Sequence, residues 1–157
     1  RTVVDAALTE SERTGGPAAA LELPDGSIVT GKTSDLLGAC SALLLNALKE
    51  LAGIGHEIKI ISPQAIEPIQ SLKTKYLGSR NPRLHTDEVL IALSVSAATS
   101  EDARLAMEQL PKLKGCQAHV SVMPGSVDIK QFKLLSVQAT FEAKYEKNSV
   151  FFNNKGV

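Results

Sequence analysis

The sequence predicts an α/β (α+β) fold in which helices cover a mixed β-sheet around a central buried helix rich in leucine and alanine. Three observations lead to this class. An Asp-Gly pair at 25–26 joins two short apolar runs, which is typical of a β-hairpin. Residues 35–52 are apolar on nearly every face, as in a helix enclosed by other elements. Alternating patterns in 89–98, 116–123 and 137–145 predict three further strands.

Length and composition fit one globular domain. The chain has 157 residues, of which 43% are hydrophobic and 22% charged, so it can form a core. Seventeen Lys and Arg residues balance 17 Asp and Glu residues, which gives no basic surface for a nucleic acid. Two cysteines cannot form a disulfide framework, and neither a signal peptide nor a membrane span is recognised. We therefore expect a cytoplasmic protein that binds neither nucleic acid nor membrane.

The chain divides into three predicted parts. Residues 1–17 are polar, include Gly-Gly-Pro and show no sustained period, which predicts a leader or linker from a missing N-terminal part. Residues 18–147 form the single α/β domain. Residues 148–157 are expected to be a C-terminal tail.

In the first half of the domain, a β-hairpin of strands 18–23 and 28–30 precedes the buried helix. Ser34 is available as the N-cap of that helix, and Gly53 or Gly55 as its stop. An extended or strand segment is expected at 58–61. The remaining signals are the Ser62-Pro63 start of a second helix, a bend at Pro68, an end at Gly78 and a polar loop over 79–88.

In the second half, the patterns predict the order β-α-β-α-β. The strand 89–98 comes first, and Ser100 then caps a helix that Pro111 and Gly115 close. The strand 116–123 follows. Asp128 is expected to cap a short helix before the last strand, 137–145.

Residues 26–33 match the phosphate-loop pattern G-x-x-x-x-G-K-[ST]. The intervening residues are rich in β-branched side chains and favour a strand, so we reject a nucleotide phosphate loop. A weaker hypothesis is an anion site formed by Lys32 and Thr33 at the N-terminus of the buried helix. The alternative is that Ser34 is only an N-cap and Lys32 a solvated hairpin end.

The loop 79–88 is the second candidate site. Its arginines are suited to a carboxylate or phosphate and His85 to proton transfer, whereas the alternative is a solvated connector. His119, on the polar face of its strand, is a candidate to line a cleft. Cys40 and Cys116 are expected in the core, and no metal-binding motif is present.

Several longer strings resemble a known family. They lie at 17–34, 36–49, 81–94 and 113–119, and include PAAALELPDGSIVTGKTS and NPRLHTDEVLIALS. These strings are similar to the C-terminal region of the mainly bacterial family called domain of unknown function 1846. The resemblance implies a larger parent protein with a separate N-terminal α/β domain, of which this chain is the C-terminal piece. It implies no reaction.

Two hypotheses on function follow. The first is an enzyme half-site that binds an anionic small molecule, with the cofactor unknown. The second is an assembly module that docks the N-terminal domain or another copy of the chain. In the first hypothesis, Lys32 and Arg83 neutralise the anion, Asn81 and Thr86 orient it, and His85 or His119 transfers a proton, with Thr33 and Asp87 as further ligand-binding candidates. This first hypothesis requires the segment around Lys32 and the loop 79–88 to converge in one cleft.

Overall fold

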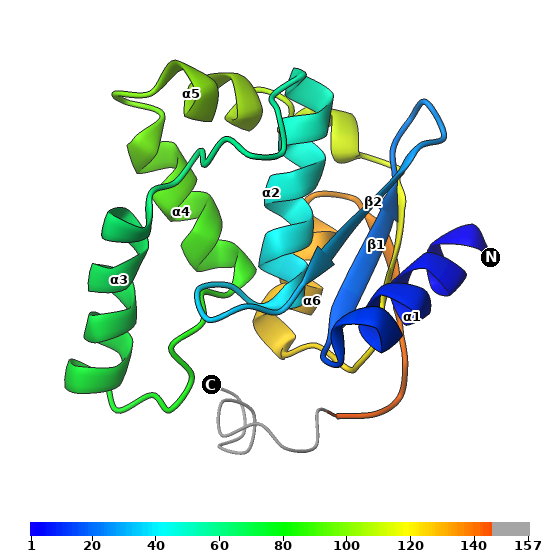
Figure 1. Cartoon of the computed structure of the whole chain (residues 1–157), viewed down its shortest axis with the longest axis horizontal. Helices are drawn as coiled ribbons and strands as arrows, with labels where there is room; N and C mark the ends of the chain where they lie inside the picture. Colours follow the sequence, from blue (N-terminus) through cyan, green and yellow to red (C-terminus); the bar gives the residue numbers. More distant parts are fainter. Residues whose placement is uncertain (146–157) are drawn as a thin grey trace.

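The computed structural model describes residues 1–145, which contain a four-stranded mixed sheet; Figure 1 shows its first two strands, β1 and β2, beside α2. The strand order is β2-β1-β3-β4. Strand β1 is antiparallel to both β2 and β3, and β3 is parallel to β4. The strands are β1 (Ala18–Glu22), β2 (Ile28–Lys32), β3 (Gln117–Val120) and β4 (Gln138–Phe141). The predicted mixed sheet and N-terminal hairpin are confirmed.

The first 17 residues, in which the sequence shows no sustained period, contain a helix. Helix α1 (Thr2–Thr14) contacts β1, β2 and β3. Val3 and Ala7 are fully buried and pack with Ala20 of β1. The sequence signal was weak because this helix buries so few side chains. Alternate residues of β1, Ala19 and Leu21, belong to the main core, which shows that helices cover both faces of the sheet.

Helix α2 (Ala39–Ala52) is the predicted buried helix and packs on β1 and β2. It begins four residues later than expected, with Gly38 rather than Ser34 as its N-cap. The Ser34 hydroxyl instead accepts hydrogen bonds from the amides of Leu36 and Leu37. Gly53, with φ 72°, ends the helix as predicted.

The connection from α2 to α3 is irregular and residues 58–61 form no strand, so of the two alternatives for this segment the strand is wrong. Helix α3 (Pro63–Ser71) begins as expected, with the Ser62 hydroxyl accepting a hydrogen bond from the amide of Ala65. It contains Pro68 and continues as a π-helical turn, η1 (Leu72–Tyr76). Gly78, at φ 74°, follows shortly after.

The strongest predicted strand, 89–98, is a helix, α4 (Thr86–Ser96). Val89, Ala92 and Leu93 are buried at helical spacing, whereas Ile91, which belongs to the same alternating pattern, is 63% exposed. Three carboxylates, those of Asp87, Glu88 and Asp128, accept hydrogen bonds from amides at the start of the helix. The observed order after the loop is therefore α-α-β-α-β, and the polar loop ends at His85.

The rest of the chain follows the predicted order. Helix α5 (Glu101–Met107) has the predicted Ser100 cap and leads into a 3₁₀ turn, η2 (Leu110–Leu113). Helix α6 (Ser126–Leu134) joins β3 to β4, but its N-cap is Gly125 and not Asp128. The last two strands are shorter than predicted. The predicted tail, 148–157, and the last two residues of the predicted domain lie outside the described residues. No helix within residues 1–145 has the length and apolar character to cross a bilayer.

Candidate functional site

The predicted polar loop forms a hydrogen-bonded network with η1 and α4. Lys73 is 5% exposed, and its Nζ donates to Arg83 O at 2.6 Å and to Glu88 Oε1 at 2.9 Å. Asn81 is 2% exposed; its Oδ1 accepts from the amide of Arg83, and its Nδ2 lies 3.1 Å from His85 Nε2. A buried lysine and asparagine with these partners hold the loop in one conformation.

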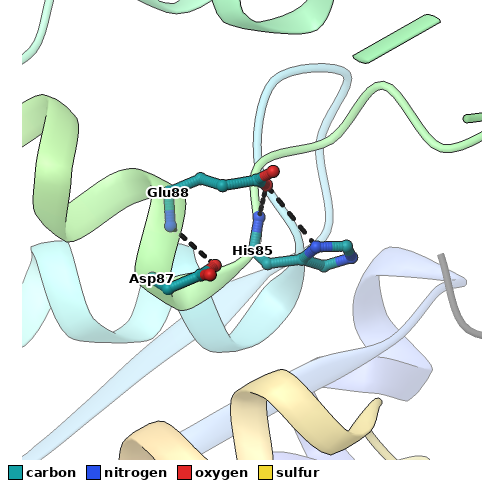
Figure 2. A group of neighbouring side chains, drawn as sticks. All are labelled: His85, Asp87 and Glu88. Carbon is teal, nitrogen blue, oxygen red and sulfur yellow. Dashed lines mark hydrogen bonds and ion pairs between the residues drawn. The ribbon is translucent and has the colours of Figure 1, made fainter. Parts of the chain in front are cut away.

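His85, Asp87 and Glu88 form a cluster at the start of α4 whose potential ligand atoms lie within 4.8 Å of one another (Figure 2). Glu88 Oε1 already accepts from Lys73 Nζ and from the amide of His85. Asp87 Oδ1 accepts from the amide of Glu88. A metal ion would compete with these donors, so the cluster fits helix capping better than metal binding.

Thr86 has a structural partner far along the chain. Its backbone N and its Oγ1 both donate to Asp128 Oδ1, at 3.0 and 2.7 Å. Thr86 is fully buried. Asp128 was predicted to cap its own helix, α6, but instead caps α4.

The two predicted polar segments lie side by side. Arg83 Nε donates to Ser34 O, and Leu84 N donates to Leu36 O. Of the two cations in these segments, Lys32 lines the cleft at the β2 edge of the sheet, whereas Arg83 is absent from the lining of that cleft. The hydrogen bonds between the two segments are largely between backbone groups.

Residues 26–33 do not form a phosphate loop. Ile28–Lys32 is strand β2, and Gly26 lies in the hairpin turn with φ 89°. Lys32 and Thr33 do not stand at the N-terminus of α2, which begins at Ala39, so this basis for an anion site is wrong. The Thr33 hydroxyl is buried and has no hydrogen-bond partner within residues 1–145.

His119 of β3 is buried and lies opposite Ala20 of β1 in the sheet register. Its Nδ1 lies 2.6 Å from Thr140 Oγ1 and its Nε2 lies 2.7 Å from Glu142 Oε2. Both ring nitrogens are engaged, and His119 does not line the cleft. The two cysteines are buried as predicted, and burial raises the pKa of the Cys40 thiol well above its ordinary value.

A cleft of about 560 Å³ lies at the β2 edge of the sheet. The end of α1, the β2 strand, one side of α2, the α2–α3 connection and the start of α3 enclose it. Its lining includes the cationic side chains Arg13, Lys32, Lys49 and Lys59, one carboxylate, Glu10, and apolar side chains such as Ile60 and Leu45.

The charges of the cleft do not cancel. Glu10 is paired with Arg13 at 2.7 Å, and the hydrogen bond from Arg13 lowers the pKa of Glu10. Lys49 is 8% exposed, and its Nζ donates to His56 O at 2.7 Å. Burial, and then the charge of Lys59, lower the pKa of Lys49, while Glu57 acts in the opposite direction. The three lysines therefore leave the cleft with a positive charge.

Sequence reasoning found only Lys32 among these cations. Arg13 lies in the segment interpreted as a leader. Lys49 is the only cation of a mostly apolar helix, and Lys59 stands between two isoleucines. Neither position has a motif that marks it in the sequence.

Comparisons with known proteins agree with the resemblance noted in the sequence. Residues 1–151 match the family model described as "Domain of unknown function DUF1846, C-terminal". The chain is 60% identical over 151 residues to a UPF0371 protein of Corynebacterium efficiens and 58% identical to one of Corynebacterium glutamicum. A UPF0371 protein of Streptococcus thermophilus is 48% identical over 151 residues. Each match covers 96% of this chain but only 30–31% of the relative's length. The chain therefore belongs to the family of DUF1846 C-terminal domains.

Proposed function

We propose that this domain binds a small anionic molecule, bearing phosphate or carboxylate groups, in the cleft at the β2 edge, as part of a larger protein. The observation that carries the proposal is the charge of the cleft. Arg13, Lys32, Lys49 and Lys59 line it with Glu10, whereas the chain as a whole has no net charge. Glu10 is neutralised by Arg13.

The environment of Lys49 supports an anion in particular. A buried ammonium group loses hydration, and that loss is offset only by hydrogen bonds and opposite charge. Lys49 has one carbonyl partner, His56 O, and its lowered pKa reflects burial beside Lys59. An anion between the two lysines would favour their charged forms and raise the pKa of Lys49.

The size and apolar part of the cleft limit the class of ligand. Its volume of about 560 Å³ falls in the range of about 300–1,000 Å³ that is typical of small-molecule sites. Leu37, Leu45 and Ile60 are among its apolar lining residues. These features favour an organic anion with an aliphatic or other apolar portion over a bare inorganic ion.

Of the ligand-binding residues that the sequence suggested, Lys32 lines the cleft and the others are absent from its lining. Lys32 remains a ligand-binding candidate. Asn81, Arg83 and Thr86 have structural partners in the loop network, so the proposal does not depend on them. Proton transfer by His85 or His119 stays a prediction, and the proposal concerns binding alone.

The test is a thermal-shift panel on this chain at constant ionic strength, with inorganic phosphate, pyrophosphate, sugar phosphates and citrate. A ligand at about 100 times its Kd adds roughly 2.7 kcal/mol of stability. We expect stabilisation by one organic anion class, and its loss in Lys49→Met and Lys59→Met. Lys133→Met, which alters an exposed lysine of α6 outside the cleft, is the matched control. A ligand that stabilises the wild type and Lys49→Met equally would contradict the proposal.

A further inference from the structure

Five large apolar side chains are exposed in two neighbouring parts of the fold. Ile91 and Val95 of α4 are 63% and 69% exposed, and Tyr76 at the end of η1 is 79% exposed. Leu72 and Leu77 are exposed beside Tyr76. We refer to Leu72, Tyr76, Leu77, Ile91 and Val95 as the α4–η1 surface.

An ion pair joins the two parts of this surface. Glu88, Ile91 and Val95 are spaced i, i+3 and i+7, so they share one face of α4. Lys73 of η1 donates to Glu88 on that face. This ion pair places η1 next to the first turn of α4, where that helix face begins. Figure 1 shows α3 and α4 on the side of α2 away from α1 and the hairpin.

Single exposed apolar residues are ordinary, but several together are typical of an interaction surface. Lys73 and Glu88, the charged groups that join η1 to this face of α4, neutralise one another, and the second lysine of η1, Lys75, is exposed to solvent. Glu88 also accepts from the amide of His85, so its carboxylate keeps two partners when water is removed. A partner can thus cover the surface without leaving either charge unpaired.

We infer that the α4–η1 surface docks the region of the parent protein that lies outside this domain. More than two thirds of the length of each relative described above lies outside the matched 151 residues. That region is covalently attached in the relatives, so its effective concentration is of millimolar order for a short flexible linker. A surface of a few apolar side chains then suffices for docking, as in other interfaces between domains of one chain. This inference is independent of the anion cleft.

The test measures thiol protection in the full-length parent and in this chain. Ile91→Cys and Tyr76→Cys each place a thiol on the surface, and Lys133→Cys on α6 is the exposed control. The native Cys40 and Cys116 are buried, so maleimide labelling, located by peptide mass mapping, reports the introduced thiol. Circular dichroism of each variant checks that it is folded.

We expect Ile91→Cys and Tyr76→Cys to react about tenfold or more slowly in the full-length protein than in this chain, as for a docked state populated at least about 90% of the time. The control should react equally in both. Equal rates for all three thiols would overturn the inference. Protection already present in this chain, and increasing with its concentration, would also overturn it, because a second copy would then be the occupant.

Discussion

The close approach of α2 to the sheet at Gly31 gives a quantitative prediction for Gly31→Ala. A Cβ at Gly31 would lie 2.6 Å from Leu43 Cα and 2.9 Å from Ala39 O, and closer still to Leu43 N. Carbon atoms in contact are normally about 3.5–4.0 Å apart. The obstructing atoms belong to the backbone of α2, so no side-chain rotation can relieve the overlap. Either α2 or β2 must move by roughly 1 Å, which disturbs the core that the two elements share.

Overpacking of this kind costs about 1–3 kcal/mol, and more where the neighbours are rigid. We expect Gly31→Ala to lose about 3 kcal/mol, which for a chain of this size corresponds to a fall in Tm of about 6–12 °C. Urea unfolding monitored by circular dichroism measures the loss. Gly16→Ala is the matched control, because a Cβ at Gly16 meets no atom within 4 Å and Gly16 has no positive φ.

The control also separates packing from chain entropy. Replacing glycine by alanine at a compatible position stabilises a protein by about 0.4–1 kcal/mol through the unfolded state, and Gly16→Ala should show this effect. A stability of Gly31→Ala within about 0.5 kcal/mol of that of Gly16→Ala would refute the close packing of α2 on β2.

Two further predictions concern the α4 cap and the cleft. Asp128→Ala removes the acceptor of two Thr86 donors, so urea unfolding should show a loss of about 2 kcal/mol; a loss no greater than that of Lys130→Ala, an exposed change on the same helix, would contradict this role. The pKa of Lys49 is lowered in the folded state by burial, so its charged form destabilises the fold at neutral pH. Wild-type stability relative to Lys49→Met should therefore rise as the pH increases through the folded pKa towards the ordinary value of about 10.4. Urea midpoints across that alkaline range measure the difference, and a difference that does not change with pH would contradict the burial of a titrating Lys49.

Elements with local signals could be predicted from the sequence. The hairpin was found because Asp25 and Gly26 specify its turn, and α3 and α5 because Ser62 and Ser100 cap them. Helix α4 was missed because its apolar residues also alternate. The residue that helps to distinguish helix from strand is Asp128, which lies 42 positions from Thr86 in the sequence.

The cationic cleft was not predicted as one site, because its residues lie far apart in the sequence. Arg13, Lys32, Lys49 and Lys59 come from α1, β2, α2 and the α2–α3 connection, and only the tertiary fold brings them to one cleft. The first hypothesis required the segment after β2 and the polar loop to converge, and their contacts are largely between backbone groups. Residue type alone could not show that the polar side chains of 81–88 mainly hold one another in place.

The most direct test of an anion site in the cleft is the pKa of Lys49 measured by NMR, through the ¹³Cε shift of the assigned lysine, with and without the organic anion that gives the largest thermal shift. We expect a pKa of Lys49 below the ordinary lysine value in the free chain and a rise when the anion binds. Exposed Lys133 should show no change. A Lys49 pKa that stays the same when the anion is saturating would contradict binding in the cleft.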